Sequence, residues 1–210
     1  ECSILNAKNG PIYIGKEAEI MEGSMVRGPF ALLEYATLKM GAKIYGATTV
    51  GPHCKIGGEV SNTIFQAYSN KGHDGFLGNS LVGEWCNFGA DTNSSNLKNN
   101  YGNIKIHSYV TNKLEQTNNI FCGVLMGDHS KTGINTMLNT ATTIGVSANI
   151  FGGEFPPKYI KSFSWGGFEN SPNFKLDKAF EVAQNMMIRR GLNLTTVDKN
   201  ILTHIADNNL

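Results

Sequence analysis

The sequence lacks an excess of either charge and lacks any long hydrophobic run. Its 18 Lys and Arg residues against 17 Asp and Glu residues leave a net charge of +1, which argues against nucleic acid or an acidic membrane surface as the main partner. No run reaches the roughly 18 apolar residues of a membrane span, and no segment has the pattern of a signal peptide. We therefore expect no nucleic-acid partner, no membrane partner and a cytoplasmic location.

The sequence also lacks close pairs of cysteines. The four that it contains, Cys2, Cys54, Cys86 and Cys122, lie far apart, which argues against zinc ligation and against a disulfide framework. We interpret them as small buried thiols in a reducing compartment. We expect no metal site in this chain.

Instead, the sequence has aliphatic residues that recur every six positions. Neither an α-helix, with a period of 3.6, nor a plain strand, with a period of 2, has that spacing. A six-residue period is typical of a parallel β-helix, in which each hexapeptide builds one side of a triangular coil and points its aliphatic residue inward. Glycine often follows that residue, which suits corners with positive φ. The inward residues form three runs: Ile14, Ile20, Val26, Leu32, Leu38, Ile44, Val50 and Ile56; Phe76, Val82 and Phe88; and Met126, Thr132, Leu138, Ile144 and Ile150.

The repeat predicts an all-β hexapeptide β-helix of about six coils over residues 1–157, which Pro156-Pro157 ends. Two polar stretches, 62–75 and 94–120, interrupt the phase and are expected to be loops expelled from corners. Since function concentrates on loops held by a rigid scaffold, these loops are the expected walls of a site.

Residues 158–210 are expected to form a C-terminal helical extension. Leu176, Phe180, Ala183 and Met187 share one face of a predicted helix over 175–190, which Gly191 ends. A second, short helix is expected to begin with a cap at Thr196. Because the chain begins without methionine, we expect that it is part of a longer protein with an upstream domain.

A run from Lys71 to Ala90, KGHDGFLGNSLVGEWCNFGA, carries a specific resemblance. With Asn96 it resembles the acetyltransferase domain of the bifunctional N-acetylglucosamine-1-phosphate uridyltransferase / glucosamine-1-phosphate N-acetyltransferase family. The run MGDHSKTGIN at 126–135 and Arg189-Arg190-Gly191 resemble the archaeal and Bacteroidetes types of this family. The resemblance covers about residues 10–190.

The resemblance implies a left-handed β-helix, a homotrimer with its sites between subunits, and acetyl-CoA as the acyl donor. The implied function is N-acetylation of an amino sugar phosphate, glucosamine 1-phosphate, in UDP-N-acetylglucosamine synthesis. It also implies an upstream sugar-1-phosphate nucleotidyltransferase domain, the only part that would need Mg²⁺.

The resemblance assigns His73 as the catalytic base, and its place in a polar loop away from the inward positions agrees with that. Acetyl transfer from a thioester needs a neutral amine, so a base that removes a proton is useful, and the ordinary pKa of histidine suits the task. Glu59, which precedes His73 in the sequence as a glutamate does in the family, is expected to orient the imidazole.

Further residues are matched to ligands. Candidates for substrate binding are Asn87, Asn96, Lys71 and Phe76. Candidates for coenzyme binding are Ala90, Lys98, Lys105 and Gly152. Asparagine offers both a donor and an acceptor to hydroxyl and amide groups, and a small residue such as Ala90 permits close approach.

The sequence departs from the family at three positions. The tyrosine three residues after the histidine is Phe76, and the arginine and lysine that hold the sugar phosphate are matched by Tyr45 and by Ser61 or Thr63. A phosphate dianion binds poorly without charge-assisted partners, so Lys43, Lys55 or Lys71 would have to substitute, or the acceptor is another amino sugar phosphate or a nucleotide sugar.

Three alternatives stay open. The chain can be a trimerising or regulatory β-helix of a thymidylyltransferase- or uridylyltransferase-like protein, without acyl transfer of its own. It can also be a structural trimerisation module with a decayed site, which the missing phosphate ligands favour. A γ-class carbonic anhydrase, another β-helix enzyme, needs three zinc-binding histidines, and the five histidines here form no convincing triad.

Overall fold

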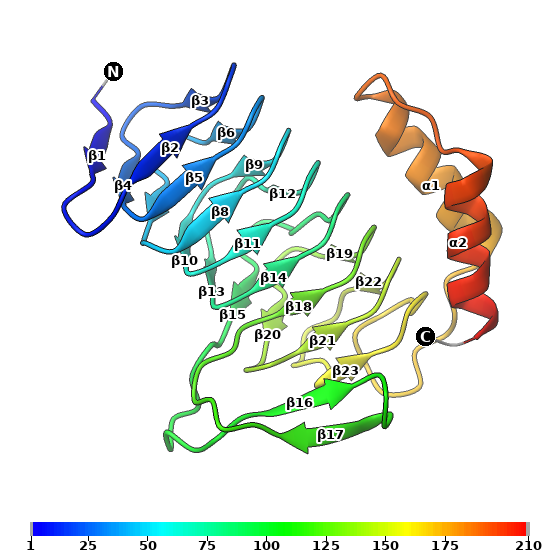
Figure 1. Ribbon diagram of the computed structural model, residues 1–210. Helices are drawn as coiled ribbons and strands as arrows, with labels where there is room; N and C mark the ends of the chain where they lie inside the picture. The colour runs from blue at the N-terminus through cyan, green and yellow to red at the C-terminus, as the bar shows by residue number, and fades with distance from the viewer. Residues whose placement is uncertain (1, 209–210) are drawn as a thin grey trace.

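The chain folds into a triangular solenoid with two helices laid along one side (Figure 1). The computed structural model describes residues 2–208. All pairs between coils are parallel, and the prediction of a left-handed parallel β-helix with C-terminal helices is confirmed. Within the described residues no helix combines the length and apolar composition needed to cross a membrane.

Three stacks of short strands make the three faces of the solenoid. Face A contains β1 (Ile4–Asn6), β4 (Met25–Arg27), β7 (Lys43–Ile44), β10 (Glu59–Ser61) and β13 (Phe76–Gly78), and further along the solenoid the pair β15 (Asn93–Ser94) and β20 (Met137–Leu138). Face B contains β2 (Ile12–Ile14), β5 (Phe30–Leu32), β8 (Thr48–Val50), β11 (Ile64–Phe65), β14 (Leu81–Val82), β18 (Leu125–Met126), β21 (Thr143–Ile144) and β23 (Tyr159–Ile160). Face C contains β3 (Glu19–Ile20), β6 (Thr37–Leu38), β9 (Lys55–Ile56) and β12 (Asn70–Lys71), and bridges through Asn87 continue it to β19 (Lys131–Thr132) and β22 (Asn149–Ile150).

The number of coils differs from the expectation of about six. Face B has eight strands, one for each coil. The difference arises because some coils are shorter than three full hexapeptides. Leu32 pairs with Val50, a full coil later, but Val50 pairs next with Phe65, and Phe65 with Val82. The last coil also extends past residue 157, since β23 adds to face B.

The stretch 62–75, expected as an expelled loop, stays within the prism. It contains β11 and β12, which pair in register with neighbouring coils. A shortened coil shifts the inward-pointing position by one residue. Leu77, with 1% of its surface exposed, points into the core, while Phe76, which was predicted to point inward, points outward and is partly exposed. The phase break is therefore real, but a shortened coil rather than a loop causes it.

The stretch 94–120 does leave the prism. It carries an antiparallel hairpin of β16 (Lys105–Ser108) and β17 (Lys113–Gln116). The hairpin lies beside the last coil, where the His107 ring stacks on the Tyr159 ring with centroids 3.5 Å apart (Figure 1).

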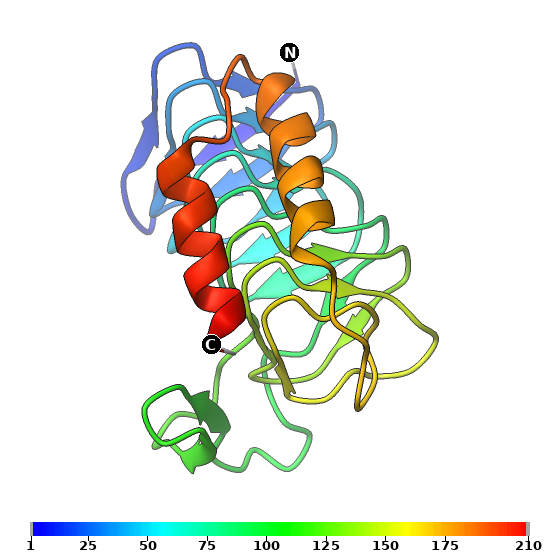
Figure 2. The same cartoon turned by 90° about the vertical axis from the view of Figure 1, so that its right-hand side faces the viewer.

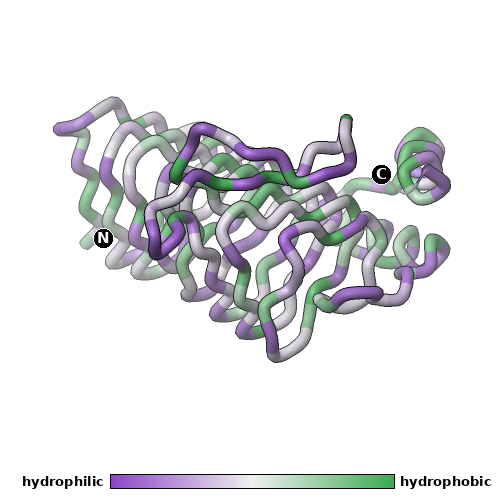
Figure 3. Tube along the Cα trace, turned by 90° about the horizontal axis from the view of Figure 1, so that it is seen from below, coloured by the Kyte–Doolittle hydropathy of each residue, from purple (hydrophilic) through white to green (hydrophobic). Residues whose placement is uncertain are grey.

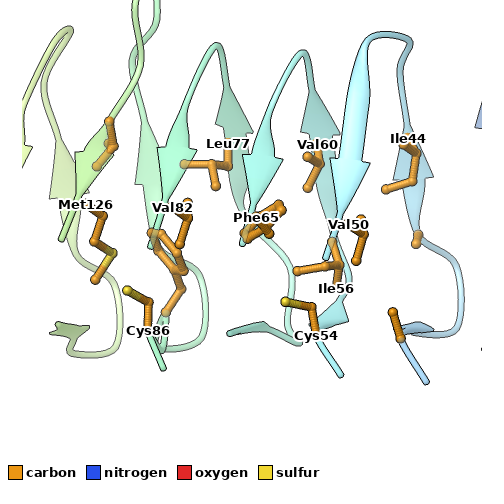
Figure 4. Packing of buried hydrophobic residues seen from close by; sticks show 14 of the residues in the cluster. Ile44, Val50, Cys54, Ile56, Val60, Phe65, Leu77, Val82, Cys86 and Met126 are labelled. Atoms are coloured by element: carbon orange, nitrogen blue, oxygen red, sulfur yellow. The ribbon is translucent and has the colours of Figure 1, made fainter. Parts of the chain in front are cut away.

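The core runs along the axis of the prism (Figure 4). Hydrophobic and hydrophilic residues alternate along the coils (Figure 3), as expected for short strands whose successive side chains point to opposite faces. The predicted inward residues from Val26 to Ile56 and from Met126 to Ile150 are all buried. Ile14 and Ile20, in the first coil described, remain partly exposed.

One corner of the prism carries a column of stacked rings. This aromatic ladder consists of Tyr35, His53, Tyr68, Trp85 and His129, one from each of five coils, and all five have φ between 55° and 59°. Neighbouring rings are nearly parallel, with centroids 4.2–5.0 Å apart up to Trp85 and 6.3 Å from there to His129. Ring stacking, worth ~0.5–1.5 kcal/mol for a pair, helps to offset the strain of the left-handed backbone.

Helices α1 (Leu176–Ile188) and α2 (Thr196–Asp207) lie side by side along one side of the prism (Figure 2). Ala179, Ala183 and Met187 of α1 and Leu202 of α2 are buried in a second apolar cluster together with Trp85. The predicted apolar face of the first helix therefore docks on the prism. The second helix is capped by Thr195 rather than Thr196, because Thr195 and Asp198 exchange bonds with each other's backbone N–H.

Candidate active site

A groove of about 780 Å³ lies over face C, beside the C-terminal end of α1. It is the space between the outward side chains of face C and the last turn of the helix. Because the solenoid core is filled, a ligand is expected in such an external groove.

The floor of the groove is a column of side chains in register. Lys55 pairs with Asn70, Asn70 with Asn87, and Asn87 with Lys131. Neighbouring strands stand ~4.8 Å apart, so the floor offers a cationic or amide group on each successive coil. All four residues line the groove.

The two edges of the groove differ in chemistry. Tyr68 and Trp85 of the aromatic ladder line one edge. His73 and Ala90 line the other, where each chain segment turns from face C towards face A. His73 is exposed and follows the floor residue Asn70 in its coil, and Ala90 follows Asn87 in the next coil.

The last turn of α1 forms the roof of the groove. Met186, Arg189 and Arg190 line it, and Nη2 of Arg190 donates to Oδ1 of Asn70 at 3.5 Å. This bond ties the helix to the coil that carries His73. Sequence reasoning used Arg189-Arg190 only as a family marker and missed their place in the groove. Two arginines at the end of a helix with an apolar docking face were the available signal.

The groove is strongly cationic. Lys39, Lys55, Lys131, Arg189 and Arg190, which we call the groove cations, all line it, and no carboxylate does so within residues 2–208. Nζ of Lys131 donates to the His129 carbonyl at 2.7 Å, and burial lowers the pKa of Lys131 to about 8. The arrangement favours an anionic ligand.

Lys71 does not reach the groove. Its side chain points into the prism, is 2% exposed, and donates from Nζ to the carbonyls of Gly57 at 3.2 Å and His73 at 2.9 Å. Gly58, with φ +70°, leaves room for this amine, because a Cβ there would lie 2.7 Å from Nζ. Lys71 therefore contacts the backbone at the His73 corner, whereas the sequence predicted that it would contact the substrate directly.

Glu59, Phe76 and Asn96 lie around the corner from the groove. Glu59 pairs with Phe76 on face A, and no hydrogen bond or ion pair joins Glu59 to His73 in the part of the chain described. Nδ2 of Asn96 donates to Oδ1 of Asn79 at 2.7 Å. Asn96 and Phe76 both lie against Gly78, so these residues form a group on face A and are separate from the groove lining.

Lys98, Lys105 and Gly152 do not line the groove either. Lys98 donates to the Asn103 carbonyl within the protruding segment. Lys105 belongs to the hairpin strand β16. Burial lowers the pKa of Lys158, and the charges of Lys98 and Lys105 lower it further. Gly152, with φ +139°, occupies a corner after β22.

Three of the predicted site residues therefore converge in one groove: His73, Asn87 and Ala90. Lys55, one of the lysines considered as a substitute for the missing phosphate ligands, joins them. Across the described residues no cluster of three or more His, Cys, Asp or Glu side chains is placed to hold a metal ion.

Comparison with curated proteins confirms the resemblance. A "Bifunctional sugar-1-phosphate nucleotidylyltransferase/acetyltransferase" of Sulfurisphaera tokodaii is 31% identical over 146 residues, which cover 69% of this chain and 36% of that protein. A "Bifunctional protein GlmU" of Trichodesmium erythraeum is 28% identical over 158 residues, covering 72% of this chain and 28% of that protein. The chain thus spans about a third of the length of the curated relatives it matches. No family model matches the chain.

Likeness to solved structures is remote. The polySia specific acetyltransferase NeuO is 14% identical with a TM-score of 0.48, over 76% of this chain and 82% of that one. LpxA, a UDP-N-acetylglucosamine acyltransferase from Bacteroides fragilis, is 14% identical with a TM-score of 0.37, over 96% of this chain and 81% of that one.

Proposed function

We propose that this chain is an acetyl-CoA-dependent N-acetyltransferase that acts on an amino sugar phosphate, glucosamine 1-phosphate, in UDP-N-acetylglucosamine synthesis. The observation that carries the proposal is the convergence of His73, Asn87 and Ala90 in one cationic groove. The relatives, whose names contain acetyltransferase or GlmU, support the same reaction.

The reaction needs two proton transfers, one as the amine adds to the thioester carbonyl and one as the thiolate leaves. His73 takes a proton from the sugar amine, and the amine lone pair attacks the thioester carbonyl carbon to form the new C–N bond. The C–S bond then breaks, and the thiolate leaves with the proton that the imidazolium returns. His73 is exposed at the groove edge, so its imidazole is accessible to an acceptor from solvent.

The neighbouring residues position the two reactants. The Asn87 amide, on the floor one coil from Asn70, offers both a donor and an acceptor to sugar hydroxyls or the acyl group. Ala90, at the edge, lets the thioester approach the backbone. Glu59 directly follows Gly58, which lies against the backbone carbonyl of His73. We propose that Glu59 orients the His73 imidazole once ligands are bound.

For the assembly we propose a homotrimer. Face B carries an outward apolar column in which Ile64 pairs with Leu81, and these two side chains are 48% and 42% exposed. Such a column suits burial against another prism. In this assembly Asn96, Lys98 and Lys105, which lie away from the groove of their own chain, are available to the groove of a neighbouring subunit.

The relatives are bifunctional and about three times as long as the matched segment. We therefore propose that the chain works joined to a sugar-1-phosphate nucleotidyltransferase domain, which would be the part that uses Mg²⁺. The acetylated sugar phosphate would be the substrate of that domain.

The test is acetylation of glucosamine 1-phosphate by this chain with acetyl-CoA, followed by mass spectrometry of the sugar. His73→Ala should lower kcat by about 10²–10⁴-fold, the usual contribution of a general base. His204→Ala is the matched control, because His204 is an exposed histidine on α2 outside the groove. Absence of product from the wild-type trimer at saturating acetyl-CoA would reject this acceptor and favour the trimerising or regulatory role.

A further inference from the structure

The groove cations are unusual because, within the described residues, they converge without carboxylate partners. Within residues 2–208 the one ion pair joins Lys178 to Glu181, on the exposed side of α1. None of the five groove cations has a carboxylate within salt-bridge distance in that part of the chain. Like charges gathered around one groove repel one another, so the arrangement is stabilised when an anion binds between them.

The positions of three groove cations indicate which kind of anion would bind. Lys55 stands on the coil next to Asn70, and Arg190 binds the Asn70 side chain from above. Arg189, which precedes Arg190 in the chain, also lines the groove. Asn70 and His73 belong to the same coil, so Arg190 contacts the coil of the proposed base. Lys55 stands on the neighbouring coil, about one strand spacing of ~4.8 Å away.

We infer that Lys55, Arg189 and Arg190 form a clamp for a phosphate monoester, with the two arginines supplied by the residues that directly follow helix α1. The inference rests on the proposed function and assigns the phosphate ligands that the sequence lacks at the family positions. In glucosamine 1-phosphate the amine and the phosphate stand on adjacent carbons. A clamp on the coil of His73 and on the coil next to it therefore fits the phosphate of the acceptor while the amine faces the base.

The clamp gives the C-terminal helices a role in binding. Helix α1 docks on the aromatic ladder through Ala179, Ala183 and Met187, which fixes its last turn over the groove. Arginine suits this position, because its guanidinium binds phosphate oxygens in pairs. Two charge-assisted contacts of this kind correspond to at least a tenfold change in affinity.

The experiment is isothermal titration of the Arg189→Gln/Arg190→Gln protein with glucosamine 1-phosphate, glucosamine, coenzyme A and 3′-dephospho-coenzyme A. The matched control is Lys175→Gln/Lys178→Gln, which removes the same charge from exposed positions at the other end of α1. We expect affinity for glucosamine 1-phosphate to fall at least tenfold in the arginine variant only, with glucosamine unaffected.

Each outcome is decisive. Weakened binding of coenzyme A but not of its 3′-dephospho form would support the monoester clamp and assign it to the donor. Equal affinities of the arginine variant and the lysine control for both phosphate ligands would overturn the inference, as would no binding of either ligand by the wild-type protein. Binding of glucosamine 1-phosphate that depends on the arginines, without acetylation, would leave the clamp standing and reject the proposed function.

Discussion

The buried amine of Lys71 makes the stability of this protein depend on pH in a way that Lys71→Met should remove. Burial lowers the pKa of Lys71 from its ordinary 10.5 to about 8, and nearby Asp74 and Asp91 only partly oppose this. Between those two pH values the unfolded chain keeps a proton that the folded chain releases. The free energy of unfolding therefore rises with pH over this range, by about 3 kcal/mol in total at ~1.4 kcal/mol per pH unit.

The assay is urea unfolding of both proteins, monitored by tryptophan fluorescence at several pH values from 7 to 10.5 and at one protein concentration. Lys131, Cys54 and Cys86 also titrate with shifted pKa values, but they are common to both proteins and cancel in the difference. The stability of Lys71→Met relative to the wild type should fall by about 3 kcal/mol from pH 7 to 10.5. Leu38→Met, an inward residue on the same face, should show a constant difference. The same constancy for Lys71→Met would refute an amine buried in the prism.

Two further predictions concern packing. Leu77→Ala should lower the free energy of unfolding, measured with urea, by about 2–5 kcal/mol, as for a buried leucine. Phe76→Ala should lower it by less, because Leu77 is 1% exposed while Phe76 faces outward. The opposite order would show that the six-residue phase continues unbroken and that Phe76 points inward. Thr195→Ala should remove the capping box of α2 at a cost of about 1 kcal/mol, visible as faster hydrogen exchange of the α2 amides, and unchanged exchange would contradict the cap.

The hexapeptide period predicted most of the fold because an inward aliphatic residue is a requirement of each short strand. It failed where coils are shortened. One such coil runs from Val50 to Phe65, which pair with each other. Counting in sixes would instead place the partner of Val50 at Tyr68. Nothing in the polar composition of 62–75 distinguishes an expelled loop from a tight coil, because outward positions of a solenoid are equally polar.

The candidate site was predictable where residues are local in the sequence. His73, Asn87 and Ala90 lie close together in the chain and on successive coils, so a motif finds them together. The cationic roof was not predictable in this way. Arg190 meets Asn70 across 120 residues of chain, and that contact depends on how α1 docks on the aromatic ladder. The inward direction of Lys71 was hidden for a different reason, since a charged residue is normally expected outside.

The variable coil length also bears on how proteins of this architecture diverge. Full-length and shortened coils stack here without breaking the parallel register of the three faces. Each coil contacts only its neighbours, so the loss of a residue at a corner is absorbed locally rather than transmitted along the solenoid. In alignments of relatives, gaps should therefore gather at the corners, and the residues after a gap are best matched by their inward partners rather than by counting sixes.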